Sequence, residues 1–498
     1  MIPRILVYLE NGPLHFGTAK YIKENLSCEL FGIINTNKGR KFYKKQNLVK
    51  FTKFWLLQDH VKNVIKSPDI NYLQEFENKY KIDLWKAIFS DAIFLHYNKF
   101  HKFSHDEILA NIEQLCKLYE SILDQINPNF LVIRLTDAIA DNLLHLMCKA
   151  RQINVSMLSQ TRFGYRSFIS NRPGILDQEA FLNFNEKKLS DKELIQLVKG
   201  YGKQQVTIKN KFRNSFLSWL RASFHFFGVM SDKDYQNYYP HTGRNIPKTI
   251  WNELMFKIQK KQRQNFLNNN AIKNVNFEKK YIYFALGLEP EGPTLISTPF
   301  YTNQIEVIRS MAKSIPVDYQ LYVKEHPMQT LSAWRNIEYY REILELPNVK
   351  LIHPSVNNEK LLKNCSLAVT VVGTPALEAA LYKKPSIVYG EVIFSMLPSV
   401  HKVKNIEDLP SLVRKAINTQ VNSNDLNKFV NIVLDNSFAY DENIINMDIL
   451  HQLFYDGYVF DIDIKIEDME KILKNAEESI EIIGSQHLER IKKYSKKV

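Results

Sequence analysis

Cysteine is scarce in this chain of 498 residues, which contains four. Cys28, Cys116, Cys148 and Cys365 lie far apart, and no two of them have the C-x-x-C spacing. Disulfide frameworks and structural zinc sites need clustered cysteines. The distribution therefore argues against both and fits a reducing compartment.

Long hydrophobic runs are also absent. No stretch reaches the roughly 18 uninterrupted apolar residues expected of a membrane-spanning helix. The first residues, Met1 to Leu9, have the pattern of a β-strand and lack the charged start and apolar run of a signal peptide. We therefore expect a cytoplasmic protein that is soluble or attached to the inner face of a membrane only peripherally.

Several common functional signatures are missing. There is no Walker loop, no G-x-S-x-G elbow and no H-E-x-x-H helix. The D-x-D matches at 232–234 and 461–463 follow no strand of a predicted sheet, so chance explains them better than metal binding. We expect no metal and no cofactor. No RRM, KH, OB or helix-turn-helix signature appears, so we expect no nucleic-acid partner either.

The composition is that of a globular protein, with 45% hydrophobic and 24% charged residues. A chain of this length is expected to form two or three domains. Basic residues outnumber acidic ones by 66 to 53, giving a formal net charge of +13. This excess favours an anionic partner, such as a nucleotide, a phosphosugar or an anionic membrane surface.

Two segments alternate short apolar runs with helical stretches, which predicts parallel sheets covered on both faces. They are residues 1–190 and 281–420. In the first, residues 38–97 show no clear strand and are interpreted as inserted helices. Residues 191–280 form a basic, mostly helical interdomain segment, and 421–498 a C-terminal helical region. The predicted fold class is α/β, with two doubly wound Rossmann-like domains facing a cleft and with helical insertions.

Ligands of doubly wound sheets bind beyond the carboxyl ends of the strands. Candidate residues therefore directly follow predicted strands. Lys324-Glu-His-Pro327 closes one such strand. His326 there can donate a hydrogen bond to a phosphate, and Pro327 ends the strand. The alternative is an ordinary histidine in a surface loop.

A second candidate is the segment from Val372 to Glu378, where a buried strand runs into Gly373 and Thr374. Thr374 is expected at the N-cap of a helix and Pro375 at its first position. Amides at a helix start suit an anionic phosphate, and Glu378 can accept hydrogen bonds from ribose hydroxyls. The alternative is a capped helix without a ligand.

Carboxylates supply the candidates for acid–base chemistry. Glu289 and Glu291 lie in a proline-containing loop after the strand that begins at Tyr281. They suit acid–base roles or an acceptor hydroxyl, although a solvated loop explains them equally well. Asp137 follows the strand ending at Leu135 in the first domain. It is a candidate base facing the cleft, or simply a helix cap.

Residues 208–228 are basic and carry large apolar side chains at helical spacing, among them Phe216, Trp219 and Phe224. Such a helix can lie on an anionic membrane surface. Packing on a core is the more common use of such a stripe.

Three groups of residues within 281–403, taken in order, resemble the capsule polysaccharide biosynthesis family, which includes Kdo (3-deoxy-manno-octulosonate) transferases. The matching residues are Tyr283-Phe-Ala-Leu with Pro290, Glu291, Thr294 and Leu295; Asn303-Gln304 and Leu321-Tyr-Val-Lys-Glu-His-Pro327; and Val372-Gly-Thr-Pro-Ala-Leu-Glu-Ala-Ala-Leu with Lys384, Pro385, Tyr389 and Gly390. The chain departs from the family pattern at Gly287 and Glu289, where the family often has His and Gln.

This resemblance implies a GT-B glycosyltransferase. The expected reaction moves a sugar, such as Kdo or a related acidic sugar, from a nucleotide donor such as CMP-Kdo to a surface polysaccharide or glycolipid. His326 would contact the donor phosphate, Thr374 and the helix start would support it, and Glu378 would reach the ribose. The resulting donor-binding set is Lys324, His326, Pro327, Gly373, Thr374 and Glu378. The catalytic set is Glu291, which the resemblance places near the reacting sugar or the acceptor, and Asp137, which is a candidate from its position alone because the N-terminal half gives no comparable match.

Other functions fit parts of the same pattern. A nucleotide-sugar 2-epimerase on the same two-domain plan would change the donor without an acceptor. A scaffold protein of a capsule export complex would bind the donor without turnover. Nucleic-acid binding has only the net charge in its favour.

Overall fold

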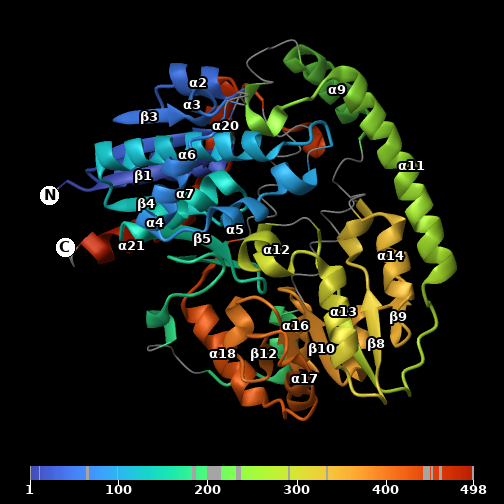
Figure 1. Ribbon diagram of the computed structural model, residues 1–498. Coiled ribbons are helices and arrows are strands. Elements are labelled where there is room, and N and C mark those ends of the chain that lie inside the picture. Colours follow the sequence, from blue (N-terminus) through green and yellow to red (C-terminus); the bar gives the residue numbers. More distant parts are fainter. Residues whose placement is uncertain are drawn as a thin grey trace.

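Two β-sheets, one in each half of the molecule, organise the fold (Figure 1). The computed structural model describes residues 2–10, 12–36, 38–62, 67–97, 99–181, 187–198, 215–230, 237–289, 292–331, 335–440, 449, 453–458 and 462–495.

The N-terminal sheet has seven strands in the order β13-β6-β5-β4-β1-β2-β3. Its five parallel strands are β1 (Arg4–Glu10), β2 (Glu29–Asn35), β3 (Lys53–Leu56), β4 (Phe130–Arg134) and β5 (Asn154–Gln160). Two antiparallel strands, β6 (Arg166–Ser170) and β13 (Phe438–Ala439), extend one edge. The short edge strand β3 corrects the expectation that residues 38–97 contain only helices.

The C-terminal sheet has six parallel strands in the order β12-β11-β10-β7-β8-β9. They are β7 (Tyr281–Ala285), β8 (Gln320–Lys324), β9 (Val349–Ile352), β10 (Leu367–Thr370), β11 (Ser386–Val388) and β12 (Val400–Lys402). Taken from β9, this is the strand order 3-2-1-4-5-6 of a Rossmann domain. Its central strands β7 and β10 are buried throughout, as expected when helices cover both faces. The predicted pair of Rossmann-like domains is confirmed.

Helices cover both sheets. Those of the first domain are α1 (Pro13–Asn25), α2 (Arg40–Lys45), α3 (Leu57–His60), α4 (Ile70–Tyr80), α5 (Leu84–Phe89), η1 (Ile93–Tyr97), α6 (His105–Ile126), α7 (Ile139–Ala150) and η2 (Gln178–Phe181). Those of the second are α12 (Gly292–Ser297), η4 (Pro299–Tyr301), α13 (Gln304–Ser314), η5 (Pro327–Leu331), α14 (Ile337–Leu344), α15 (Asn358–Asn364), α16 (Pro375–Leu381), η6 (Ile393–Met396), α17 (Leu409–Ile417) and α18 (Ser423–Asp435). All four cysteines are buried thiols.

Local sequence sets the ends of the longest of these helices, α6. Ser104 accepts the amide of Glu107, and the Glu107 carboxylate accepts the amide of Ser104, which completes a capping box. Asn127 ends the helix in the left-handed conformation, with φ of 39°.

The C-terminal region, residues 421–498, divides between the two domains. Helix α18 packs into the core of the second domain through Leu426 and Phe429. The chain then returns to the first domain, where β13 pairs with β6 and the helices α20 (Ile466–Asn475) and α21 (Glu477–Ser495) pack on α1. Figure 1 shows these last helices, in red, among the blue elements of the N-terminal domain. A short turn, η7 (Tyr455–Gly457), precedes them.

The interdomain segment contains α9 (Phe216–Met230), η3 (Tyr239–His241) and α11 (Ile246–Asn270). Both long helices lie at the outer edge of the molecule, and the end of α11 packs on α14 of the second domain, where Leu267 is buried (Figure 1). Their described apolar side chains are in large part exposed. Among the described helices, none combines the length and the apolar composition needed to cross a bilayer.

Candidate functional site

The two domains meet through loops that follow the carboxyl ends of their strands. Asp137, after β4, lies against Gly292, which begins α12 after β7. A Cβ atom on Gly292 would lie 2.5 Å from the Cβ of Asp137. Arg162, after β5, donates a hydrogen bond of 2.8 Å to the carbonyl of Val372, after β10. The strand ends of the two sheets therefore face each other, which is the GT-B arrangement that the sequence predicts.

His326 lies directly after β8 at this boundary, where the motif places it. Its Nδ1 accepts the amide of Met328 at 3.2 Å, so the neutral ring carries its proton on Nε2. Desolvation lowers the pKa of His326 to about 4. At neutral pH the imidazole is thus an uncharged hydrogen-bond donor through Nε2, which suits a phosphate oxygen.

Lys324, the last residue of β8, is 3% exposed, and its ammonium group bonds to Oδ1 of Asn358. Desolvation lowers the pKa of Lys324 to about 8, although the nearby Glu378 carboxylate acts in the opposite direction. At neutral pH most protein molecules therefore carry Lys324 in its protonated form. The cation lies two residues before His326 in the sequence, and Glu378 belongs to the second predicted motif.

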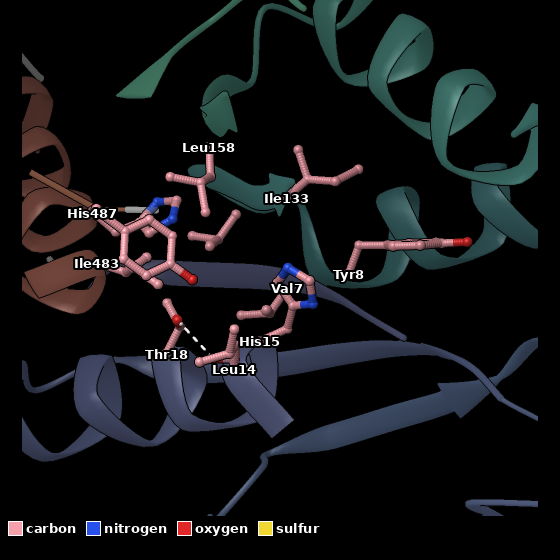
Figure 2. Close-up of a pocket in the computed structure, with 11 residues that line it drawn as sticks. Val7, Tyr8, Leu14, His15, Thr18, Ile133, Leu158, Ile483 and His487 are labelled. Atoms are coloured by element: carbon pink, nitrogen blue, oxygen red, sulfur yellow. Dashed lines mark hydrogen bonds between the residues drawn. The ribbon is translucent and has the colours of Figure 1, made fainter. Parts of the chain in front are cut away.

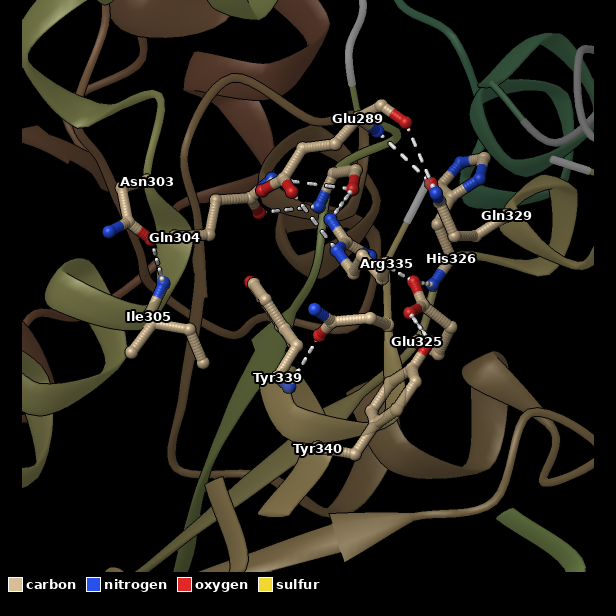
Figure 3. A network of polar contacts seen from close by, with 12 residues as sticks. Glu289, Asn303, Gln304, Ile305, Glu325, His326, Gln329, Arg335, Tyr339 and Tyr340 are labelled. Carbon is tan, nitrogen blue, oxygen red and sulfur yellow. Dashed lines mark hydrogen bonds and ion pairs between the residues drawn. The ribbon is translucent and has the colours of Figure 1, made fainter. Parts of the chain in front are cut away.

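A buried polar network supports the backbone around His326 (Figure 3). Glu325 accepts the amide of His326 at 2.6 Å and the hydroxyl of Tyr340 at 2.5 Å, and it forms an ion pair with Arg335. Burial disfavours the charged form of Arg335, but Glu325 and Glu289 outweigh it and raise the pKa of the guanidinium. The network fixes the turn that presents His326.

Glu289, a candidate for acid–base chemistry from the sequence, also belongs to this network. Its carboxylate binds Arg335 at 3.2 Å and accepts a bond of 2.5 Å from Gln304. Gln304 also accepts the amide of Gly287 at 2.8 Å, and Gln329 exchanges two bonds of 3.1 Å with the backbone of Glu289. Glu289 therefore has a structural part in holding the loop after β7. Glu291, the other candidate of this loop, lies outside the described residues.

Thr374 occupies the N-cap position of α16, as predicted, but its side chain does not cap the helix. Its backbone is helical, with φ of −61° and ψ of −21°, and its hydroxyl donates to Oε1 of Glu378 at 3.1 Å. The amide of Gly373 donates to Oγ1 of Thr370 at 3.3 Å. The structure thus joins Thr374 and Glu378 into one polar pair beside the glycine.

Pro327 begins the short helical turn η5 directly after His326. The strand β8 already ends at Lys324, so Pro327 follows the strand and opens this turn, and the prediction that Pro327 itself ends the strand is wrong.

Asp137 belongs to a cluster of three carboxylates with Glu10 and Asp141, whose oxygens lie within 4.8 Å of one another. Arg134 supplies positive charge, with contacts of 2.7 Å to Glu10 and 2.8 Å to Asp137. Desolvation between the domains raises the pKa of Asp137, while Arg134 opposes the shift. A carboxylate with a raised pKa is a stronger base, which suits the predicted role.

Within this cluster, Asp141 is the residue whose side chain caps the start of helix α7. It accepts the amide of Ala138 at 2.9 Å and that of Asp137 at 3.1 Å, and its own side chain is buried. Helix capping is the alternative role that the sequence predicts for Asp137, but in the structure Asp141 fills that role. This leaves the Asp137 carboxylate directed at Arg134.

A small cavity lies within the N-terminal domain, between β1, β4, α1 and α21 (Figure 2). Its lining is mainly apolar, with His15, Thr18 and His487 among the exceptions. His487 bonds to Oγ of Ser156 at 2.8 Å, and desolvation lowers its pKa to about 3. None of the predicted site residues lines this cavity.

Sequence reasoning missed the side chains whose roles depend on distant partners. Arg335 lies in a polar stretch with no motif, and its position beside Glu325 follows only from the fold. Arg162 follows a predicted strand in the first domain, which is the one sequence signal that singles it out.

Comparison with known proteins gives one family match. Residues 220–400 match the family model described as capsule polysaccharide biosynthesis protein. No curated protein matches the chain.

Solved structures similar to the chain include the UDP-GlcNAc 2-epimerase from Methanocaldococcus jannaschii. It has 13% identity over 90% of this chain and 99% of that chain, with a TM-score of 0.26. The β-Kdo 2,7 transferase of Thermosulfurimonas dismutans KpsC has 12% identity over 71% of this chain and 87% of that chain, with a TM-score of 0.29. The family match covers the three groups of motif residues, and residues 220–400 carry the sequence pattern of the capsule polysaccharide biosynthesis family.

Proposed function

We propose that this protein is a glycosyltransferase that uses a nucleotide-sugar donor. The observation that carries the proposal is the position of His326, a neutral donor of hydrogen bonds held by a buried ionic network at the end of β8. Lys324 and the Thr374–Glu378 pair belong to the ends of β8 and β10, where Rossmann domains bind nucleotides. The family match to residues 220–400 supports a glycosyltransferase-like role.

In this proposal His326 donates from Nε2 to a donor phosphate, and protonated Lys324 adds positive charge behind it. Glu378 accepts a hydrogen bond from the ribose, while Thr374 orients its carboxylate. Pro327 and Gly373 shape the backbone on either side of the phosphate. Such fixed dipoles and charges stabilise the departing nucleotide phosphate as the bond to the sugar breaks.

The acceptor side is assigned to the N-terminal domain. Asp137 is proposed as the base that takes the proton of the acceptor hydroxyl, and Glu291 as a carboxylate near the reacting sugar. We propose that transfer needs no metal, because Lys324 supplies positive charge and His326 a hydrogen-bond donor on the side of the donor phosphate. Addition of EDTA should leave the rate unchanged.

The proposed donor sugar is Kdo or a related acidic sugar, carried by CMP, and the proposed acceptor is a surface polysaccharide or glycolipid. This assignment rests on the resemblance of residues 281–403 to a family that includes Kdo transferases. The same two-domain plan suits a nucleotide-sugar 2-epimerase, which would convert the donor without any acceptor. A scaffold protein would bind the donor and leave it unchanged.

The test begins with thermal unfolding in the presence of CMP, CDP, UDP, GDP and their sugar conjugates, since a ligand of the folded state raises its stability. A shift with one nucleotide selects the donor for transfer and epimerisation assays. Transfer to an acceptor supports the proposal. Conversion of the donor alone favours the epimerase, and donor binding with neither reaction favours the scaffold. No shift with any nucleotide contradicts the donor site itself.

His326→Ala identifies the site within that assay. Loss of a hydrogen bond to a charged group should weaken donor binding roughly 10- to 100-fold. His401→Ala is the matched control, because His401 lies on the edge strand β12 of the same domain and bonds to Thr419 at 2.9 Å. Equal donor affinity of the two variants would remove His326 from the site.

We also propose that the protein works at the inner face of an anionic membrane, which it contacts through α9 and α11. Within 208–228 the described side chains of Phe216 and Phe224 are 69% and 75% exposed, and Trp251 of α11 is 61% exposed. Helix α9 contains no acidic residue and α11 contains one, Glu253. Apolar side chains with basic neighbours suit the surface of an anionic bilayer.

Vesicle sedimentation tests this contact. The protein should bind vesicles that contain phosphatidylglycerol and not vesicles of pure phosphatidylcholine. The double variant Phe224→Ser, Trp251→Ser should lose the binding. Failure to bind either vesicle, or self-association that the double variant abolishes, would contradict the membrane contact.

A further inference from the structure

Arg162 is an interdomain arginine for which neither the fold nor the motifs give a purpose. It follows β5 in the turn Thr161-Arg-Phe-Gly-Tyr165. Three residues of this turn, Arg162, Gly164 and Tyr165, have φ of 64°, 63° and 52°. Left-handed backbone costs free energy at residues other than glycine, and it persists where surrounding contacts impose it, often at functional sites.

Surrounding contacts do impose this conformation. Phe163 is fully buried in the core of the second domain, with its ring 5.8 Å from that of Phe429. Arg166 donates to Oγ of Ser437 at 2.8 Å and to the carbonyl of Leu434 at 3.1 Å. The turn of the first domain is therefore anchored in the second, and this fixes the direction in which the Arg162 side chain leaves the backbone.

The Arg162 guanidinium ends beside the second predicted motif. Its Nη1 donates to the carbonyl of Val372 at 2.8 Å, directly before Gly373 and Thr374. Within the described part of the chain it makes no ion pair. An arginine remains charged at all physiological pH values and offers five N–H donors, of which this bond uses one.

The carboxylates of α16 and of the loop after β11 already have partners. Glu378 accepts from Thr374, and Glu391 is shared between Arg172 at 3.4 Å and Lys402 at 3.8 Å. A partly buried guanidinium with spare N–H donors gains more from an anion than from a neutral acceptor, because hydrogen bonds between charged groups are the stronger ones. We therefore expect the anion that pairs with Arg162 to belong to a bound ligand.

We propose that Arg162 binds an anionic group of the donor, reaching from the first domain to the nucleotide site of the second. This inference rests on the proposed function and deepens it, because it makes the nucleotide site a joint product of both domains. The chemistry recognised is a planar or tetrahedral oxyanion, which is either the nucleotide phosphate or the carboxylate of an acidic sugar. Binding needs no bond to be made or broken.

Calorimetric titration of the full chain with CMP and with CMP-Kdo tests the proposal, at several salt concentrations. Arg162→Gln should weaken binding roughly 10- to 100-fold. A loss with both ligands indicates the phosphate, and a loss with CMP-Kdo alone indicates the carboxylate. Arg172→Gln, which removes an exposed partner of Glu391, is the matched control and should bind as the wild type does.

The salt dependence separates a ligand contact from a structural role. Arg162→Gln should make the affinity less sensitive to salt because one ion pair with the ligand is lost, whereas Arg162→Lys should keep most of that sensitivity. Unchanged affinity of a folded Arg162→Gln protein, or a weakened affinity with an unchanged salt dependence, overturns the inference. If the wild type binds neither ligand while other nucleotides also fail, the proposed function itself is overturned.

Discussion

At the scale of single residues, the donor side of the boundary depends on buried charges that compensate each other. Arg335 is the central case, because it neutralises Glu325 and also holds Glu289. Arg335→Met would leave Glu325 buried without a counter-ion, which costs about 3–5 kcal/mol. Urea unfolding followed by tryptophan fluorescence would measure this loss of stability.

Arg341 supplies the control for that experiment. It also forms an ion pair in the same region, with Glu338 at 2.5 Å, but both side chains are more than half exposed. Exposed pairs contribute about 0–1 kcal/mol, so Arg341→Met should be nearly neutral. If the two variants lost similar stability, the network of Arg335 would not be the support of the His326 turn.

Lys324 gives a prediction about pH. Its pKa of about 8 means that the ammonium loses its proton as the pH rises through 8, well below the usual range for lysine. If the cation attracts the donor phosphate, donor affinity should be constant below this pH and fall up to tenfold per pH unit above it. Titration calorimetry with the donor between pH 7 and 9.5 would record the change.

Lys324→Arg is the informative variant, because an arginine stays protonated over this whole range. The decrease in affinity above pH 8 should then disappear, even if the overall affinity is lower. A wild-type affinity that does not change between pH 7 and 9.5 would show that Lys324 has no electrostatic part in donor binding.

At the scale of elements, the contact between α1 and α21 ties the C-terminal end of the chain to the first domain. Gly484 makes this contact possible: a Cβ atom there would lie 2.4 Å from Cδ1 and 2.9 Å from Cβ of Tyr21 on α1. Gly484→Ala gains about 1 kcal/mol of helix propensity, but overpacking costs about 1–3 kcal/mol. The clash involves an atom next to the backbone, so we expect a net loss of stability.

Thermal or urea unfolding of Gly484→Ala, compared with Ser485→Ala, measures this balance. Ser485 is the next residue of α21, and its hydroxyl bonds to the carbonyl of Ile482 at 2.9 Å, within the same helix. Its replacement should be neutral or slightly stabilising. A Gly484→Ala protein that is more stable than the wild type would mean that α21 does not pack tightly on α1.

The elements also explain which parts of the fold the sequence could predict. Central parallel strands such as β7 are buried on both faces and appear as continuous apolar runs, so the C-terminal sheet was predictable. The strand β3 has four residues and β13 has two, too few for a periodic pattern. Their assignment depends on pairing with partners far along the chain.

The same distinction holds for the site. His326 and Thr374 follow predicted strands directly, so position and residue type together made them candidates. Arg162 bonds to the carbonyl of Val372, which is 210 positions away in the sequence. Arg335 bonds to the carboxylate of Glu325, and the motif around Glu325 gives no sign of this partner. Contacts made by folding two separate segments together leave no local pattern.

At the scale of the whole molecule, function depends on how closely the two domains approach. The close contact of Gly292 with Asp137 joins the loop after β7 to the proposed base of the first domain. His326, Lys324 and Thr374 all belong to the second domain. Donor binding therefore uses these side chains of the second domain together with the proposed contact of Arg162 from the first, whereas transfer also needs the proposed base to lie close to the donor site.

Gly292→Ala separates these two properties. The new methyl group would lie 2.5 Å from Cβ and 2.9 Å from Cα of Asp137, and the backbone atom cannot rotate away. The domains must then move apart by about 1 Å to restore ordinary carbon–carbon contacts. A displacement of this size at a reacting centre reduces turnover by about 100-fold, so kcat of the transfer reaction should fall more than the donor affinity does, because the long side chain of Arg162 can follow a shift of this size.

The control for this variant is Gly287→Ala in the same loop, where a Cβ atom would make an ordinary contact of 3.5 Å with Nε2 of Gln304. It should retain both donor affinity and turnover. A Gly292→Ala protein with normal kcat would mean that the approach of Asp137 is not needed for transfer. An equal loss of donor affinity and turnover would mean instead that the substitution acts on the donor site, and the division of roles between the domains would be wrong.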